Sequence, residues 1–291
     1  MITADLFQED YQKLSGLNMK KILITGSDGY IARNIAKNFS DYDLTLINRS
    51  KLNLLDSKSV KNFFKYRYFD AVIHTATSGG SRLKTDDGNV FYENCLMHQN
   101  ILDNTSSYAK LISFGSGAEL DRRYDVDPTV DYKKSFPVDP YGMSKNFIVK
   151  SGLMYPNFYN IRIFNVFNED ELPSRMIKSN IVNYLNKQPI VIHQNKWMDF
   201  FYMNDLCEVV KLVIDGYVDE KIINCSYKEK YKLSDIAKII NSLSDYNVEV
   251  IVEKDKFGLN YIGDYNLHQD NLSLSGIHLG IENTYKALKD L

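Results

Sequence analysis

A tyrosine and a lysine one helical turn apart are the side chains of this sequence best suited to acid–base chemistry. Tyr141 and Lys145 occur in the segment Tyr-Gly-Met-Ser-Lys, and a spacing of four residues puts both on one face of a helix. An ammonium group beside a phenol favours the phenolate, which lowers the pKa of the tyrosine towards the range of a general acid or base. The pair therefore predicts proton transfer to or from a substrate oxygen.

The spacing by itself is a weak signal, because the chain contains 21 tyrosines. Two further pairs of this kind are Tyr217/Lys221 and Tyr285/Lys289. Tyr141 differs from them in its position, since it follows the fourth strand–helix unit of the predicted sheet and a strand end that carries Ser116. Ligands of open α/β sheets bind at the carboxyl ends of the strands. We therefore expect a site at this place.

A glycine-rich turn follows the first predicted strand. The run from Thr25 to Ala32 has glycine at positions 26 and 29, the first for a tight turn and the second for close approach of the backbone to a pyrophosphate. The amides at the start of the next helix would then face the phosphate charge. A plain structural turn is the alternative, but the place between a strand and a helix favours dinucleotide binding. The expected contact residues are Gly26, Asp28, Gly29, Tyr30 and Ile31.

The end of the second predicted strand bears on the choice of cofactor. An acidic side chain there accepts hydrogen bonds from the ribose of NAD, whereas this chain has Asn48 and Arg49. A guanidinium fork suits the 2′-phosphate of NADP. A solvated loop position for Arg49 is the alternative, and Asp28 is a contrary sign because a carboxylate repels a nearby phosphate. The sequence predicts NADP, with NAD as the alternative.

Short apolar runs alternate with helical patterns through the first half of the chain, which is the order of a parallel sheet covered by helices. The predicted strands are 21–25, 44–48, 70–75, 110–114 and 159–164, and the predicted helices are 31–39, 57–66, 90–106 and 141–154. After residue 168, helices are expected at 174–186, 204–215 and 233–243, with strands at 189–193, 221–224 and 248–252. The sequence predicts an α/β fold, a Rossmann-type doubly wound parallel sheet with a smaller C-terminal α/β substrate lobe.

The chain divides accordingly into three parts. Residues 1–18 are expected to form an N-terminal leader, in which Leu6, Tyr11 and Leu14 fit the apolar side of a short helix, with Met19 as an alternative start. Residues 19–167 are expected to form the NADP-binding domain, and residues 168–291 mainly the substrate-binding lobe.

The composition excludes several other classes of protein. The chain of 291 residues is 44% hydrophobic and 25% charged, the profile of a folded globular protein. A net charge of −2 argues against nucleic-acid binding, which needs a cationic excess. The three cysteines lack metal or disulfide spacing, and no apolar run approaches the roughly 18 residues of a membrane span. We therefore expect a cytoplasmic protein without metal, membrane or nucleic-acid partners.

Several motifs in a fixed order give the chain a family resemblance. They are the glycine loop, Leu52-Asn-Leu-Leu-Asp56, Asp70-Ala-Val-Ile-His74-Thr-Ala76, Ser116, the Tyr141/Lys145 pair and Arg162-Ile-Phe-Asn165. This set resembles the extended short-chain dehydrogenase/reductases of the sugar-nucleotide epimerase/dehydratase type. Within that family it is most similar to GDP-L-fucose synthase-like enzymes and related 4-keto-6-deoxy-sugar reductases.

The resemblance implies a role for each motif. Ser116 would hydrogen-bond the reacting oxygen, Tyr141 would move the proton, and Lys145 would hold the nicotinamide ribose while tuning Tyr141. Further cofactor contacts are expected from Leu54, Asp56, Thr75, Ala76, Thr77 and Phe164. Phe164 and Asn165 are expected to face the nicotinamide or the sugar.

The departures from the family pattern bear on the reaction. Enzymes of the GDP-L-fucose synthase type use a cysteine and a histidine for an epimerisation step, and Ala118 and Arg175 occupy those positions here. The Asp-Glu pair of the dehydratases is replaced by Gly117 and Ala118, with Glu119 one position out of register. Because the residues for epimerisation and for dehydration are both replaced, the expected activity is reduction of a keto group.

The substrate lobe also departs from the pattern. The Arg-Asp-Phe of the family is Met198-Asp199-Phe200 here, so an arginine that would bind a substrate phosphate is absent. Lys196 and Arg175 are the candidate replacements.

We therefore predict an NADPH-dependent reductase of a nucleotide-activated 4-keto or 4-keto-6-deoxy sugar, serving deoxysugar or surface-polysaccharide biosynthesis. One alternative is a sugar-nucleotide 4-epimerase that retains NAD. A second is a cofactor-binding protein of the same fold without catalysis. The resemblance also implies a homodimer formed through the helix that carries Tyr141.

Other polar and aromatic residues have structural interpretations. His74 lies on an apolar strand and is expected to be a hydrogen-bonded, nearly buried residue. The remaining histidines, at positions 98, 193, 268 and 278, have no metal-ligand spacing. Trp197 could stack on a base or pack between the lobes. The lysine-rich run 228–232 is expected to be a solvated loop.

Overall fold

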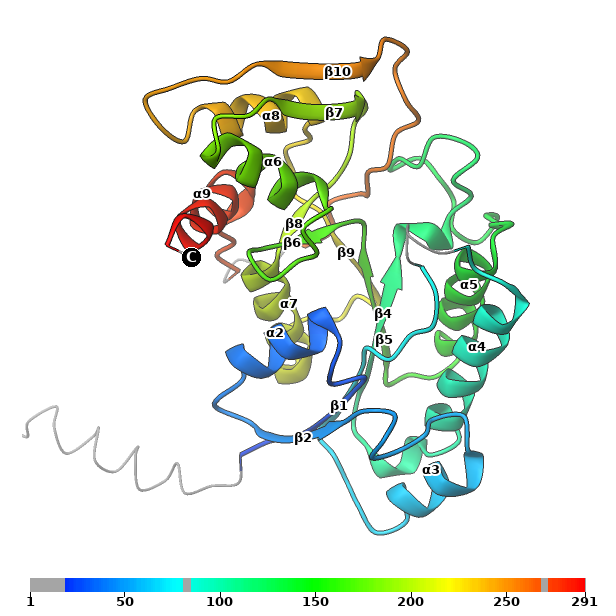
Figure 1. Ribbon diagram of the computed structural model, residues 1–291. Coiled ribbons are helices and arrows are strands. Elements are labelled where there is room, and N and C mark those ends of the chain that lie inside the picture. The colour runs from blue at the N-terminus through cyan, green and yellow to red at the C-terminus, as the bar shows by residue number, and fades with distance from the viewer. Residues whose placement is uncertain (1–18, 81–84, 268–271, 291) are drawn as a thin grey trace, which may run out of the picture.

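A six-stranded parallel sheet forms the centre of the protein. The computed structural model describes residues 19–80, 85–267 and 272–290, and its large sheet has the strand order β2-β1-β3-β4-β5-β9 (Figure 1). Every neighbouring pair in this order is parallel. The strands are β1 (Lys21–Thr25), β2 (Asp43–Ile47), β3 (Ala71–His74), β4 (Leu111–Ser116), β5 (Phe158–Ile163) and β9 (Ile222–Cys225).

Helices cover both faces of this sheet. Strands β3 and β4 are buried along their whole length, which is the pattern of a parallel sheet enclosed on both sides. One face packs against α2 (Tyr30–Asn38) and α7 (Met203–Asp215). The other face packs against α3 (Ser57–Phe64), α4 (Gly88–Leu102) and α5 (Pro140–Gly152) (Figure 1). The predicted doubly wound sheet is therefore confirmed.

The chain reverses its direction across the sheet at β1. From β1 it passes to β2 on one side and then returns to β3 on the other side. In such sheets a crevice forms beside the reversal, at the carboxyl ends of the strands. Gly26, directly after β1, lies there against Ala76, two residues after β3. The fold therefore brings the glycine loop to the edge where ligands bind.

A smaller lobe stands on the carboxyl edge of the large sheet (Figure 1). It contains α6 (Met176–Leu185), α8 (Leu233–Asn241) and α9 (Gly276–Lys289), and β7 (Ile190–Gln194) pairs in parallel with β10 (Val250–Lys254). These elements enclose an apolar core around the fully buried ring of Tyr184. A short parallel pair, β6 (Val166–Phe167) and β8 (Phe201–Tyr202), lies between the lobe and the large sheet.

The predicted elements agree with the observed ones within a few residues, but none of the predicted ranges covers α9, β6 or β8, and two further differences occur. The predicted helix 90–106 ends at Leu102, and a separate 3₁₀ turn (Thr105–Ser107) follows, because Asp and Asn at positions 103 and 104 favour turns over helix. The segment from α7 to β9 returns to the large sheet, although it lies within the range assigned mainly to the lobe. The leader 1–18 lies outside the described residues.

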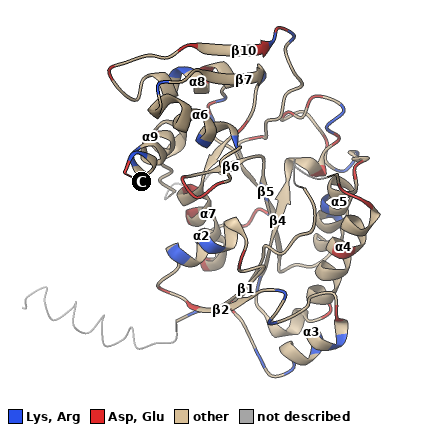
Figure 2. Ribbon diagram, in the orientation of Figure 1, with Lys and Arg blue, Asp and Glu red and all other residues tan. Residues whose placement is uncertain are grey.

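Charged residues of both signs are interspersed over the two lobes. Figure 2 shows lysine and arginine beside aspartate and glutamate along most of the chain, in keeping with the net charge of −2. Within the described ranges, no helix is both long enough and apolar enough to cross a membrane.

The buried carboxylate of Asp199 joins the lobe to the edge of the large sheet. Its Oδ2 accepts hydrogen bonds from Ser226 Oγ at 2.6 Å and from the Gly263 amide at 2.8 Å, and Lys230 Nζ lies 3.0 Å away. Ser226 directly follows β9. The expectation of a solvated loop over 228–232 is therefore wrong for Lys230, which is held inward by this carboxylate.

Replacement of Asp199 should destabilise the protein. In Asp199→Ala the Gly263 amide loses its acceptor, the Ser226 hydroxyl keeps only the Gly263 carbonyl at 3.1 Å, and the Lys230 ammonium loses its counter-ion. We therefore expect the free energy of unfolding to fall by about 2–4 kcal/mol. Urea unfolding measures the change. The control is Asp170→Ala, because Asp170 forms an exposed ion pair with Lys37 and its loss should cost less than about 1 kcal/mol. Equal losses in the two variants would contradict the assignment.

Candidate active site

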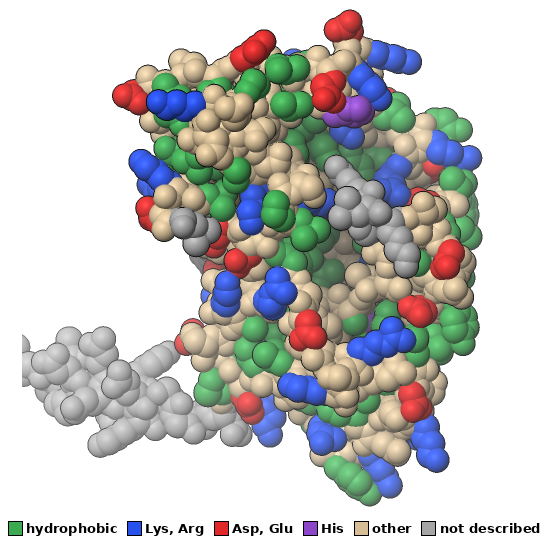
Figure 3. Space-filling view, viewed as in Figure 1, with side chains coloured by type: hydrophobic (Ala, Val, Ile, Leu, Met, Phe, Trp, Pro, Cys, Tyr) green, Lys and Arg blue, Asp and Glu red, His purple; other side chains and the backbone are tan. Residues whose placement is uncertain are grey.

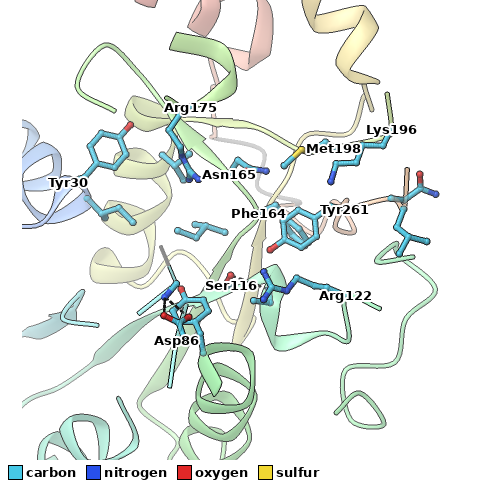
Figure 4. Close-up of a pocket in the computed structure, with 18 residues that line it drawn as sticks. Tyr30, Asp86, Ser116, Arg122, Phe164, Asn165, Arg175, Lys196, Met198 and Tyr261 are labelled. Atoms are coloured by element: carbon cyan, nitrogen blue, oxygen red, sulfur yellow. Dashed lines mark hydrogen bonds between the residues drawn. The ribbon is translucent and has the colours of Figure 1, made fainter. Parts of the chain in front are cut away.

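Two cavities open along the carboxyl edge of the large sheet. The larger has a volume of about 440 Å³ and lies between the sheet and the smaller lobe (Figure 4). The other has a volume of about 340 Å³ and lies beside the glycine loop. The chain leads from one to the other, since Gly26 and Gly29 line the smaller cavity and Tyr30 and Ile31 line the larger one. Figure 3 shows the surface hollowed between the lobes, with basic side chains beside the hollow.

The glycine loop packs too closely on Ala76 to admit a side chain at Gly26. Gly26 has a φ of +66°, in the left-handed region that favours glycine, and a Cβ built on it would lie 2.7 Å from Ala76 Cα. The Gly29 amide donates to the Gly26 carbonyl at 2.9 Å and closes the turn. Helix α2 begins directly after Gly29 without a side-chain cap. Its first amides can therefore bind an anion, and the loop fits the pyrophosphate of a dinucleotide.

Most residues predicted to contact the cofactor line the smaller cavity. They are Gly26, Asp28, Gly29, Asn48, Arg49, Leu54, Thr75, Ala76 and Thr77. Four others, Tyr30, Ile31, Tyr141 and Phe164, line the larger cavity. Asp56 lines neither cavity, because its carboxylate accepts hydrogen bonds from the amides of Lys58 and Ser59 and caps α3.

The Asp28 carboxylate faces the end of β2. The side-chain amide of Asn48 donates to its two oxygens at 3.0 and 3.2 Å. The next residue, Arg49, is exposed at the same cavity. The Asp28 carboxylate is therefore hydrogen-bonded by the neutral side chain of Asn48. The Arg49 guanidinium is free of this contact and can bind an anionic ligand in the same cavity.

Ser116 and Tyr141 line the larger cavity together. Tyr141 is the second residue of α5, which begins after the capping carboxylate of Asp139, and its hydroxyl hydrogen-bonds Ser116. Lys145 lies one turn further along α5 and lines neither cavity; its Nζ donates to the Phe114 carbonyl at 2.8 Å and lies 5.6 Å from the centre of the Tyr141 ring. The three residues predicted to act together are thus neighbours in space.

Burial sets the protonation of this group. It raises the pKa of Tyr141 above its ordinary value, and the charges of Tyr261 and Glu119 add to the effect, while the Ser116 hydrogen bond and Arg122 lower the pKa. The expectation of a lowered tyrosine pKa is therefore wrong for the protein alone. Burial also lowers the pKa of Lys145 to about 8, against the opposing field of Glu119.

A buried ion pair fixes the end of β4. Glu119 is inaccessible to solvent, and its carboxylate pairs with Arg162 Nε at 2.8 Å. It also accepts from the Ser116 amide at 2.9 Å and from Asn160 Nδ2 at 3.1 Å. The Ser116 hydroxyl in turn accepts from the Ala118 amide at 3.1 Å. These contacts hold Ser116 between β4 and β5.

The wall of the larger cavity formed by the smaller lobe carries the predicted substrate residues. Asn165, Arg175 and Lys196 all line it, and Figure 4 shows them above the sheet end that bears Ser116. The same three residues line a third cavity of about 380 Å³ that extends between α6 and β7. The Arg175 guanidinium lies 4.0 Å from the buried carboxylate of Glu171.

The positions that depart from the family pattern also face the larger cavity. Ala118, Arg175 and Met198 line it. Among the described residues of its wall there is no cysteine or histidine, and the one carboxylate is Asp86, which accepts hydrogen bonds from the Gly80 amide.

Sequence reasoning missed several residues of this cavity. Arg122, Asp86 and Tyr261 come from loops that carry none of the recognised motifs. Arg122 had a detectable signal, because it lies six residues after Ser116 and follows the same strand. Tyr261 had none, since it reaches the site from a distant segment and packs edge-on against Phe164.

The structural interpretations of other residues are borne out in part. His74 is buried and its Nδ1 hydrogen-bonds Thr25 Oγ1 at 2.8 Å, as expected. Trp197 packs at the lobe, where Lys232 lies over its ring. Neither Tyr217 nor Tyr285 lines the two main cavities. Within the described ranges no group of three histidine, cysteine or acidic residues could hold a metal ion, and His268 lies outside those ranges.

Comparison with known proteins agrees with this architecture. A model of the NAD dependent epimerase/dehydratase family matches residues 22–226. GDP-L-colitose synthase of Yersinia pseudotuberculosis is 23% identical over 268 residues, which cover 81% of this chain and 86% of that protein. A trifunctional UDP-glucose 4,6-dehydratase, 3,5-epimerase and UDP-4-keto-L-rhamnose reductase of Arabidopsis thaliana is 22% identical over 265 residues, 77% of this chain and 39% of that protein. The chain thus spans about two fifths of the length of the plant relative.

A solved structure shares the fold over nearly the whole chain. The GDP-mannoheptose C4 reductase of Campylobacter jejuni, solved with NADP bound, superimposes with a TM-score of 0.77 at 16% identity. The match covers 94% of this chain and 99% of that one.

The close approach of Gly26 to Ala76 leads to a test of the glycine loop. In Gly26→Ala the new methyl group collides with the Ala76 backbone in a backbone conformation unfavourable for alanine, so we expect binding of NADPH and NADH to fall at least about tenfold, as measured by thermal shift titration. Gly276→Ala is the matched control, because Gly276 has a φ of +77° and open space around its Cβ position. A Gly26→Ala variant that binds as well as Gly276→Ala would contradict this use of the loop.

Proposed function

The chain belongs to the NAD-dependent epimerase/dehydratase family, and from this premise we propose that it is an NADPH-dependent reductase of a nucleotide-activated 4-keto or 4-keto-6-deoxy sugar. One observation carries the proposal: the hydroxyls of Ser116 and Tyr141 share a cavity whose described wall offers no cysteine or histidine. The cavity thus has the groups needed to protonate a carbonyl oxygen. The described wall lacks the cysteine and histidine that enzymes of the GDP-L-fucose synthase type use for epimerisation.

The smaller cavity supports binding of the cofactor. The turn at Gly26 and the uncapped start of α2 suit the pyrophosphate, and Arg49 suits the additional phosphate of NADP. When bound, the cofactor supplies the hydride for the reduction. The residues of the larger cavity must then manage the charge that develops on the substrate oxygen.

Ser116 and Tyr141 can both donate hydrogen bonds to a carbonyl oxygen in the larger cavity. As the carbonyl carbon gains a hydride, negative charge grows on that oxygen, and donors already held in position stabilise it. Tyr141 then gives its proton to the oxygen. Burial favours this role, because it keeps the tyrosine protonated before the reaction.

The cations and the cavity of the smaller lobe support binding of the substrate through a nucleotide. Arg175 and Lys196 lie where the larger cavity joins the third one, between α6 and β7. We propose that they bind the diphosphate in place of the family arginine, whose position Met198 occupies. The nucleoside would extend into the third cavity.

We also propose that the protein acts as a homodimer. The outer surface of α4 and α5 carries exposed apolar side chains, among them Phe147 and Met154. They line a shallow depression of about 560 Å³ together with Phe91, Phe136 and Met143. Burial of such a surface against a second copy removes it from water.

The reductase function is tested with NADPH and a panel of GDP-, CDP-, dTDP- and UDP-linked 4-keto-6-deoxy sugars. We expect net oxidation of NADPH with at least one of them, followed by nicotinamide absorbance. Tyr141→Phe should lower kcat by about 10²–10⁴-fold and leave the affinity for NADPH within about twofold. Tyr217→Phe is the control, because Tyr217 belongs to another Tyr-x-x-x-Lys pair and is exposed. Interconversion of sugars without net oxidation would favour the NAD-retaining 4-epimerase, and an inert protein that binds NADPH would favour the non-catalytic alternative.

The choice between cofactors is tested at Arg49. A guanidinium bonded to a phosphate contributes about 1.5–3 kcal/mol, so Arg49→Ser should weaken NADPH about tenfold or more and leave NADH unchanged, by fluorescence titration. Arg67→Ser is a suitable control, because Arg67 is exposed and bonds the Phe63 carbonyl away from both cavities. Wild-type protein that binds NADH more tightly than NADPH would overturn the preference.

A further inference from the structure

The larger cavity contains a cation that the reaction described so far does not use. Arg122 lines the cavity with Ser116, Tyr141 and Tyr261. Figure 4 shows its side chain reaching towards Ser116 below the ring of Tyr261, while Lys196 and Arg175 lie on the other side of the cavity. A diphosphate bound between those two residues would leave Arg122 at the end where the carbonyl reacts.

A carboxylate fixes Arg122 relative to Tyr141. Arg122 Nη2 lies 2.8 Å from Asp139 Oδ2. The other oxygen of Asp139 accepts from the Gly142 amide at 2.8 Å and caps α5. The loop before Arg122 packs on the same turn, since a Cβ on Gly142 would lie 2.6 Å from the Ala118 carbonyl. Asp139 therefore holds Arg122 in a fixed position relative to the start of α5, which carries Tyr141.

The other cation near Tyr141 has a different character. Lys145 is almost fully buried behind the tyrosine and donates to the Phe114 carbonyl. Burial lowers the pKa of Lys145 to about 8, and Glu119 opposes this shift. His74 and His98 also face Lys145, and burial lowers the pKa of both, so that their rings are neutral. Lys145 thus loses its charge as the pH rises through about 8. A guanidinium keeps its charge throughout this range.

We propose that Arg122 is a positioning residue for proton transfer, which stabilises the phenolate left on Tyr141 when its proton passes to the substrate oxygen. The O–H bond of Tyr141 breaks, a new O–H bond forms on the substrate oxygen, and the electron pair of the broken bond stays on Tyr141 Oη. The carbonyl carbon is reduced by the hydride it receives. The assignment rests on the reductase function proposed above.

The charges around Tyr141 favour this assignment. Tyr261 and Glu119 raise its pKa and therefore oppose the phenolate, whereas Ser116 and Arg122 lower it. Asp86 adds another negative group, since it holds the Gly80 amide and Gly80 packs on the Tyr141 ring. Arg122, although paired with Asp139, is the cation of the cavity wall that lowers the pKa of Tyr141 against these groups, and a guanidinium stays charged at any working pH.

Kinetics at two pH values separate this role from a structural one. Below the pKa of Lys145 both Arg122 and the ammonium 5.6 Å from the centre of the Tyr141 ring are charged, and above it only Arg122 is. In Arg122→Met the loss of kcat should therefore be at least about tenfold larger at about pH 9.5 than at about pH 6.5. The kcat of Arg122→Lys should show the same pH dependence as that of the wild type up to about pH 9.5, because an exposed ammonium group stays charged to that point. A loss in Arg122→Met that is the same at both pH values would overturn the proposal.

Arg123→Met is the matched control for these measurements. Arg123 is adjacent in the chain, pairs with Asp121, and does not line the cavity, so its loss should change kcat by less than about twofold at either pH.

A second measurement needs no substrate. Carbon-13 at Cζ of tyrosine reports each phenol by NMR, and Tyr141→Phe identifies the signal of Tyr141. We expect the Tyr141 phenolate to form at a lower pH in the wild type than in Arg122→Met. Identical titration of Tyr141 in the two proteins would overturn the role of Arg122. Absence of turnover in the wild type would count against the reductase function alone, and the NMR titration would then decide on Arg122.

Discussion

The geometry of the active site depends on one buried carboxylate. Glu119 has no contact with solvent, and a charge in such a place is tolerated only when it is paired and fully hydrogen-bonded. Arg162, Asn160 and the Ser116 amide supply those bonds, so the turn after β4 cannot move without exposing or unpairing the charge. Ser116 is thereby locked against β5, within reach of the tyrosine that α5 carries. A residue that stands out of register for dehydration chemistry thus orders the turn that carries Ser116.

Two opposed requirements meet at Tyr141. In the proposed reduction the tyrosine holds its proton before the reaction and carries a negative charge after it. Burial meets the first requirement, because it raises the pKa of the phenol, and positive groups meet the second. The net charge of −2 over the whole chain says nothing about this balance, since fields inside a cavity are set by the few charges that face it. The cations to which the proposals assign a role lie in separate places: Arg49 at the smaller cavity, and Arg175 and Arg122 at opposite ends of the larger one.

The sequence was sufficient for the architecture and for most of the wall of the cofactor cavity. Strand ends could be located from apolar periodicity, and residues that follow parallel strands meet at one edge, so Asn48, Thr75 and Ser116 could be placed together in advance. Arg122 and Tyr261 could not, because they lie in irregular loops whose paths depend on tertiary packing. The direction of the pKa shift of Tyr141 could not be predicted from the sequence either. Burial, which depends on the folded structure, raises this pKa by more than a lysine one helical turn away lowers it. Asp56 shows the opposite case, in which a recognised motif residue serves as a helix cap.

The arrangement of the larger cavity gives a bound sugar a direction. The hydroxyls of Ser116 and Tyr141 lie at the sheet end of the cavity, and the cations proposed for the diphosphate lie at the lobe end, next to the third cavity. A ligand anchored by its phosphates at the lobe would therefore present the far side of its sugar to Ser116 and Tyr141. This orientation requires the lobe to sit at a fixed distance from the sheet, and Asp199 supplies that connection through Ser226 and Lys230. The aspartate of Met198-Asp199-Phe200 therefore has a structural role, because its contacts join the two ends of the cavity.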